Sequence, residues 1–120
     1  MPADGRAAAG GRAEALAADF LVARGLVIVE RNFRCRRGEI DIIARDGDTL
    51  VFAEVRLRTR QDFGGAAASI TARKRARMTA AALYYLGRQA RTPPPCRFDA
   101  LLLDSLDSTR IEWLKDIIGA

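Results

Sequence analysis

Apolar and polar residues alternate along two neighbouring segments near the middle of the chain. Residues 38–45 read GEIDIIAR and residues 50–58 read LVFAEVRLR, and alternation of this length is typical of half-buried β-strands. Between them lies DGDT, Asp46 to Thr49, which is a strong turn signal. The pattern therefore predicts a β-hairpin with one apolar and one charged face.

The charged face of this hairpin gathers acidic residues from both strands. Because side chains alternate across a strand, Glu39 and Asp41 share one face. Glu54 and Arg56 share a face of the second strand in the same way. A turn over Asp46–Thr49 would place Asp41 opposite Glu54, whereas a two-residue loop would place Glu39 there. The opposite, apolar face is expected to contain Ile40, Ile42, Ala53, Val55 and Leu57.

The remaining segments predict helices and further strands around the hairpin. The expected helices cover residues 11–24 and 71–90, and the expected strands cover residues 26–33 and 97–103, with a short edge strand over 109–114. Ser69 or Thr71 would cap the second helix. A strand–helix–strand connection of this length is typical of a parallel crossover. Residues 1–9 are expected to be flexible.

Length and composition fit one α/β domain over residues 1–120. The chain has 120 residues, of which 49% are hydrophobic, enough for an independent core. We expect a mixed β-sheet of four to five strands flanked by helices. Within it, Asp99 is interpreted as an ion-pair partner and Trp113 as a core or interface anchor.

The net charge of +5 favours an acidic partner. Nucleic acid comes first among such partners and an anionic membrane surface second. No run is long and apolar enough to span a bilayer, so we expect no membrane partner. The N-terminus lacks the apolar block of a signal peptide, and we expect a cytoplasmic protein.

The absence of histidine excludes histidine-dependent catalytic triads and histidine-based zinc sites. The two cysteines, Cys35 and Cys96, have no metal-ligand spacing and are expected to be free thiols. Any metal would therefore need oxygen ligands. The clustered carboxylates suit Mg²⁺, which binds one or two carboxylates together with water and phosphate. The same alternation is also typical of a solvated sheet face with cross-strand ion pairs.

Several short motifs carry a resemblance to known proteins. Gly38-Glu39-Ile40-Asp41, a hairpin and then Glu54-Val55-Arg56 resemble the Asp…Glu-X-Lys site of restriction-endonuclease-like nucleases. More closely, the chain resembles the YraN-like family of small bacterial proteins. That match comprises Gly11, Glu14, Leu16-Ala17, Gly25, Arg31-Asn32, Arg34, the GEID run, Val51-Phe52, Glu54-Val55, Phe63-Gly64, Lys74 and Arg97-Phe98-Asp99. The family is similar in pattern to archaeal Holliday-junction resolvases, which implies a restriction-endonuclease-like core.

The resemblance also implies a metal-dependent endonuclease site. Asp41 and Glu54 would hold Mg²⁺ or Mn²⁺ with the help of the Val55 carbonyl, while Glu39 and Glu14 would act through water or a second ion. Arg56 stands where the nuclease pattern has lysine. Arginine can stabilise phosphate charge but cannot act as a general base. Lys74 would enter the site from the helix as a substitute.

Two functional hypotheses follow, and a third concerns assembly. The first is a Mg²⁺- or Mn²⁺-dependent endonuclease acting on branched or damaged DNA. The second is a catalytically inactive nucleic-acid-binding module, with DNA preferred over RNA in both. The basic residues expected to bind nucleic acid are Arg34, Arg36, Arg37, Arg58, Arg60, Arg73, Lys74, Arg75 and Arg77. The third hypothesis is a protein–protein adaptor that forms a homodimer through Trp113 and nearby apolar residues.

Overall fold

The computed structural model describes residues 5–57, 71–88, 92–104 and 110–118. Its elements in chain order are α1 (Gly5–Ala23), β1 (Val27–Cys35), β2 (Gly38–Asp46), β3 (Thr49–Leu57), α2 (Ala72–Gly87), β4 (Cys96–Leu103) and β5 (Ile111–Leu114). The five strands form one sheet in the order β1-β2-β3-β4-β5. The expected α/β fold with a mixed sheet is therefore confirmed, and it is consistent with a restriction-endonuclease-like core.

Strand directions agree with the crossover that the sequence predicts. β1, β2 and β3 are successively antiparallel, β4 is parallel to β3, and β5 returns antiparallel to β4. The parallel step is made by α2, which Thr71 caps by accepting a hydrogen bond from the Lys74 N–H at 3.1 Å. The strand over residues 111–114 lies at the edge of the sheet, as expected.

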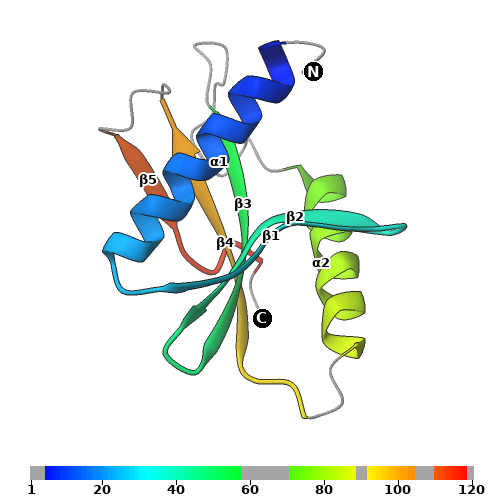
Figure 1. Ribbon diagram of the computed structural model, residues 1–120. Coiled ribbons are helices and arrows are strands. Elements are labelled where there is room, and N and C mark those ends of the chain that lie inside the picture. Colours follow the sequence, from blue (N-terminus) through cyan, green and yellow to red (C-terminus); the bar gives the residue numbers. More distant parts are fainter. Residues whose placement is uncertain (1–4, 58–70, 89–91, 105–109, 119–120) are drawn as a thin grey trace.

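The two helices pack on opposite faces of the sheet (Figure 1). Beneath α1, Ala17 and Leu21 pack against Val51, Ala53 and other fully buried strand residues. Beneath α2, aromatic residues dominate: Phe33, Phe52, Tyr85 and Phe98 pack with ring centroids 5.2–6.0 Å apart. None of the described helices is both long enough and apolar enough to cross a membrane.

The β2–β3 hairpin has the register that brings Asp41 toward Glu54. Arg45 pairs with Leu50, and the pairing of the two strands continues to Ile42 opposite Ala53. Asp46 and Thr49 also pair, so the turn itself is only Gly47–Asp48. Gly47 has φ +60°, a conformation that favours glycine. The two-residue loop therefore does not place Glu39 opposite Glu54, contrary to that alternative.

The prediction that Ile40 and Ile42 share one apolar face of β2 is wrong. Ile42 packs in the cluster beneath α1, whereas Ile40 packs with Phe33 in the cluster beneath α2. The described β2–β3 pairs end at Ile42, while β2 stays paired with β1 as far as Gly38. Because the start of β2 leaves β3 and follows β1 beside α2, strict alternation fails there (Figure 1).

Helix α1 begins at Gly5, six residues before the expected start at Gly11. Residues 5–9 therefore extend this helix, while the flexibility expected for residues 1–9 stays a prediction. The run from Ala7 to Ala9 explains the difference, because alanine has the highest intrinsic helix propensity and needs no apolar stripe to favour a helix.

Asp99 is fully buried and forms a polar junction between β4, β5 and the C-terminal segment. It accepts hydrogen bonds from Arg97 Nε at 3.1 Å, from Trp113 Nε1 at 2.9 Å and from the Asp116 N–H at 2.9 Å. The expected ion-pair role of Asp99 is confirmed. Trp113 packs edge-on against Phe20 of α1, so it is part of the core.

Gly38 explains how closely the start of β2 can approach α2. A Cβ atom at this position would lie 2.3 Å from the Arg77 carbonyl oxygen and 2.9 Å from its carbon. We expect Gly38→Ala to lower the free energy of unfolding by about 1–3 kcal/mol, because helix and strand must move apart. Urea denaturation of both proteins would measure this loss. Gly87→Ala is the control, since nothing lies within 4 Å of a Cβ there, and an unchanged Gly38→Ala protein would contradict the close contact.

Candidate functional site

Asp41 and Glu54 meet where β2 separates from β3. Asp41 Oδ2 accepts a hydrogen bond from the Val55 N–H at 2.8 Å. The described backbone pairs between β2 and β3 end at Ile42 and Ala53, so beyond this point the Asp41 side chain binds a backbone N–H of β3. Glu54 is 2% exposed and lies on the face of β3 that carries the α2 cluster. The two carboxyl groups lie close enough that each contributes to the shifted pKa of the other. The expected meeting of these two acids is confirmed.

Lys74 brings a positive charge to this acid pair from α2. Its Nζ atom lies 2.5 Å from Glu54 Oε2. The Glu54 side chain is 3% exposed and that of Lys74 is 37% exposed, so the ammonium group bridges a buried acid and solvent. The sequence hypothesis that Lys74 approaches the acids from the helix is confirmed as geometry.

Glu14 approaches the same pair from α1. It is 6% exposed, and its Oε1 atom lies 3.3 Å from Arg31 Nε of β1. The charge of Asp41 contributes to the raised pKa of Glu14, which indicates that the two acids lie near each other. The site therefore combines residues of α1, β2, β3 and α2.

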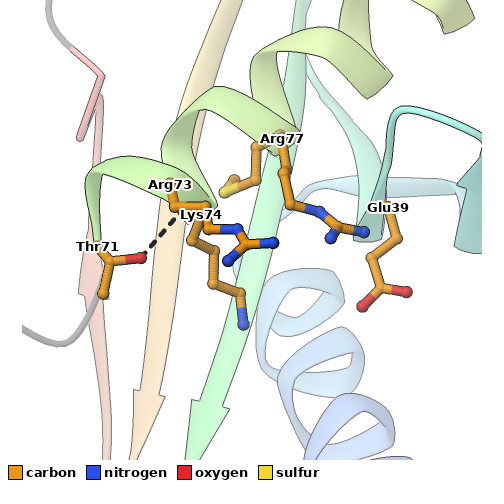
Figure 2. Close-up of a pocket in the computed structure, with 6 residues that line it drawn as sticks. Glu39, Thr71, Arg73, Lys74 and Arg77 are labelled. Carbon is orange, nitrogen blue, oxygen red and sulfur yellow. Dashed lines mark hydrogen bonds between the residues drawn. The ribbon is translucent and has the colours of Figure 1, made fainter.

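A pocket opens beside the acid pair, between the start of β2 and the first turns of α2. It has a volume of about 320 Å³ and is lined by Glu39, Thr71, Arg73, Lys74, Arg77 and Met78. In Figure 2, Arg73, Lys74 and Arg77 project from α2 on the side of the helix near Glu39. Glu39 is exposed at the rim and pairs with Arg34 at 3.5 Å. A solvent-borne anion can thus reach Lys74 while passing two arginines.

Arg56 does not join this group of side chains. Among the described residues no ion pair links it to Asp41 or Glu54, and it does not line the pocket. Its Nε atom is buried without a hydrogen-bond partner, as is that of Arg75. A catalytic role for Arg56 therefore stays a prediction. Among the residues that the structure describes, the side-chain cation in contact with Glu54 is Lys74.

Most of the basic residues expected to bind nucleic acid fall into two groups in the structure, whereas Arg75 lines neither of these two pockets. Arg73, Lys74 and Arg77 line the pocket beside the acids. Arg34, Arg36 and Arg37 line a second groove, near the end of α2. Arg58 and Arg60 lie outside the described residues. Tyr84 and Arg88 of the second groove were missed, because the sequence pattern of α2 indicated only which residues face the core.

Burial and mutual repulsion perturb the acids strongly. Burial raises the pKa of Glu54, with the Asp41 charge adding to it and Lys74 opposing it, to about 7. The pKa of Asp41 is also raised, first by burial and then by Glu39, against the lowering effect of the Val55 N–H. Burial likewise raises the pKa of Glu14. Acids held in this way are typical of functional sites.

The donor set fits one divalent cation shared by two carboxylates. Within the described ranges no three acidic or cysteine side chains are arranged to hold a metal ion. Mg²⁺ and Mn²⁺ nevertheless need only one or two carboxylates when water and phosphate complete the ligands. Asp41 is half-buried and Glu54 is buried, the two lie close together, and both have a raised pKa, so a cation between them would relieve their repulsion.

Residues 13–103 match the uncharacterised protein family UPF0102. This chain belongs to that family. A UPF0102 protein of Methylobacillus flagellatus is 50% identical over 111 residues, which cover 92% of this chain and 96% of the relative. A UPF0102 protein of Nitrosospira multiformis is 51% identical over 107 residues, covering 89% of each chain. The YraN-like resemblance is thus confirmed, and the UPF0102 match spans all four acids and Lys74.

The buried acids of this UPF0102 protein make its stability depend on pH in the absence of metal. Between the ordinary value of 4.5 and about 7, folded Glu54 keeps a proton that the unfolded chain has lost. Raising the pH through this window therefore favours unfolding, by on the order of 3 kcal/mol at most for a shift of this size.

We expect the urea midpoint in EDTA to fall from pH 5 to pH 8, and the fall to be smaller in Glu54→Gln, which cannot ionise. Glu30→Gln, on the exposed side of β1, is the matched control and should keep the wild-type slope. A wild-type midpoint that rises over the same range would contradict the raised pKa.

Proposed function

We propose that this protein is a divalent-metal-dependent DNA endonuclease with its site at Asp41, Glu54 and Lys74. The observation that carries the proposal is the contact between Lys74 Nζ and the buried Glu54 carboxylate, beside Asp41. Two acids and a lysine are the side chains that the nuclease pattern combines. Here the lysine comes from α2 and not from the position of Arg56.

Each side chain has a part in this proposal that follows from its surroundings. Asp41 and Glu54 would hold Mg²⁺ or Mn²⁺, which would activate a water molecule and stabilise charge on the phosphate. The Val55 N–H holds the Asp41 carboxylate in place. Lys74, anchored on Glu54, would direct its remaining N–H donors to a phosphate oxygen or to the attacking water.

The surrounding residues support binding of a phosphodiester backbone. Arg73 and Arg77 are exposed on the side of α2 that lines the pocket, where they could hold phosphates flanking the cleaved one. Glu39 stands at the pocket rim and would act through water. Glu14 lies near Asp41, so its negative charge would add to the attraction for a cation.

Cleavage assays test the proposal. The purified protein is incubated with four-way, flap and linear DNA in Mg²⁺ or Mn²⁺, and with EDTA as the control. We expect metal-dependent cleavage, with branched DNA preferred. DNA binding that is strong at low salt, with no cleavage in either metal, would instead favour the inactive binding module, for which the arginine at position 56 is the supporting observation.

A further inference from the structure

A second groove lies between the last turns of α2 and the turn that joins β1 to β2. Its volume is about 700 Å³. Arginines, a tyrosine ring and an apolar side chain line it, namely Arg34, Arg36, Arg37, Leu83, Tyr84 and Arg88. It is distinct from the pocket beside the acids, because the two pockets share no lining residue.

The charge of this groove favours an anion. None of its lining residues is acidic, and four of them are arginines. Cys35 and Gly38 pair with each other across the β1–β2 hairpin, and Arg36 and Arg37 form the tight turn between them. Both arginines are exposed. Within the part of the chain that the structure describes, neither of these two arginines forms an ion pair. Arg34 pairs with Glu39 across the hairpin, and the Arg88 guanidinium lies 5.9 Å from the centre of the Phe33 ring.

The groove also presents an aromatic ring, which a site for small anions does not need. Tyr84 is 51% exposed and Leu83 is 64% exposed. The Tyr84 ring rests on Phe33, with centroids 6.3 Å apart and planes tilted by 32°. Phe33 is itself buried and packed against Tyr85, so the ring has a firm support. Arginines beside an exposed, supported aromatic ring are the combination that binds single-stranded nucleic acid.

The groove and the acid site lie along the same two elements. Both are bounded by α2, at its first turns for the acids and at its last turns for the groove. Both are also bounded by the β1–β2 hairpin, which touches α2 at Gly38. Lys74 and Tyr84 are ten residues apart on α2, which corresponds to about 15 Å along the helix axis. That distance is about four nucleotides at the stacked spacing of 3.4 Å.

We propose that this groove binds an unpaired DNA strand, with its phosphates on the arginines and one base stacked on Tyr84. The proposal deepens the endonuclease function, on which it rests for the assignment of DNA as the ligand. It makes the substrate a branched or flapped molecule whose unpaired strand starts about four nucleotides from the cleaved bond. A paired duplex does not fit, because its bases are stacked inside the helix and cannot reach a ring in a concave groove.

Cys35 offers a direct test, because it lines the same groove and is a free thiol. The test uses the full chain with Cys96→Ser, which leaves Cys35 as its one thiol. Alkylation of Cys35 is timed in EDTA with a 20-nucleotide single strand, a blunt duplex or heparin. With the single strand at ten times its Kd we expect alkylation to slow by about tenfold, as mass action requires for a covered site. Duplex and heparin, each at ten times its own Kd, should slow it much less. Equal protection by heparin or duplex would overturn the proposal.

Variants of Tyr84 supply a second readout. We expect Tyr84→Ala to weaken single-strand binding by about 5- to 100-fold and Tyr84→Phe to bind nearly as wild type, because stacking needs the ring and not the hydroxyl. Duplex binding should change little in either variant. Unchanged single-strand binding by Tyr84→Ala would also overturn the proposal.

These binding measurements need no cleavage, so the two proposals can fail separately. Protection of Cys35 by the single strand, without cleavage of any DNA in Mn²⁺, would retain the groove and reject the endonuclease. If flap and linear duplex DNA are cleaved at the same metal-dependent rate, and no DNA protects Cys35, the endonuclease proposal is retained and the groove proposal is rejected.

Discussion

Replacing Asp41 by Asn or Glu54 by Gln is expected to lower metal-dependent DNA cleavage by about 10³-fold. Either change removes a carboxylate charge from the cation that both residues would hold, and a bound metal supplies several kcal/mol of transition-state stabilisation. Both substitutions keep the size of the side chain. The loss should therefore appear in kcat/KM for cleavage, measured at saturating Mn²⁺, and not as loss of the folded protein.

The stability of these variants separates catalysis from folding. Glu54→Gln removes the repulsion between the buried Glu54 carboxyl group and Asp41, and Lys74 is exposed enough to contact water, so the fold should be at least as stable at pH 8. Glu30→Gln removes an exposed acid of β1 and should cleave as wild type. Cleavage that continues unchanged in Asp41→Asn and Glu54→Gln would point to another site or to a contaminating nuclease.

Replacing Lys74 by Met is expected to lower kcat for cleavage by about 10²- to 10³-fold. The change removes the ammonium group beside Glu54 but keeps an unbranched apolar side chain, and loss of one donor aimed at developing charge has an effect of this size. Arg73→Met is the matched control from the adjacent position on α2. Because Arg73 is exposed and would hold only flanking phosphates, its loss should mainly raise KM and reduce the salt dependence.

Arg56→Lys separates the two positions from which a lysine could act. Since Lys74 already lies against Glu54 and Arg56 has no ion pair with either acid in the described residues, we expect Arg56→Lys to leave the cleavage rate close to that of wild type. A large gain of activity in Arg56→Lys, or full activity in Lys74→Met, would contradict the assignment of Lys74.

The hairpin and its acids were predictable because local signals determine them. The Gly47 turn and the alternation of residues 38–45 and 50–57 predict the hairpin and its acidic face, but they left two registers open, and the structure has the one that brings Asp41 to Glu54. The parallel crossover was equally predictable from the lengths of the segments between β3 and β4. In each case the pattern within a short stretch was enough.

Features that depend on how elements pack could not be read from the sequence. Ile40 follows β1 to α2 because β2 leaves β3, and no residue near Ile40 signals that separation. The sequence suggested that Lys74 might approach the acids, but only the position of α2 brings Nζ to Glu54. Tyr84 gave no signal, since its role depends on Phe33 and on the arginines of a distant turn.

The central claim is that Asp41 and Glu54 together hold one divalent cation, and calorimetric titration of Mn²⁺ tests it most directly. We expect uptake by the wild-type protein and little or none by Asp41→Asn. Because the pKa of Glu54 is about 7, binding should release more protons at pH 6 than at pH 8, as seen from the heat in buffers of different ionisation enthalpy. Equal Mn²⁺ uptake by wild type and Asp41→Asn, or none by either, would contradict the claim.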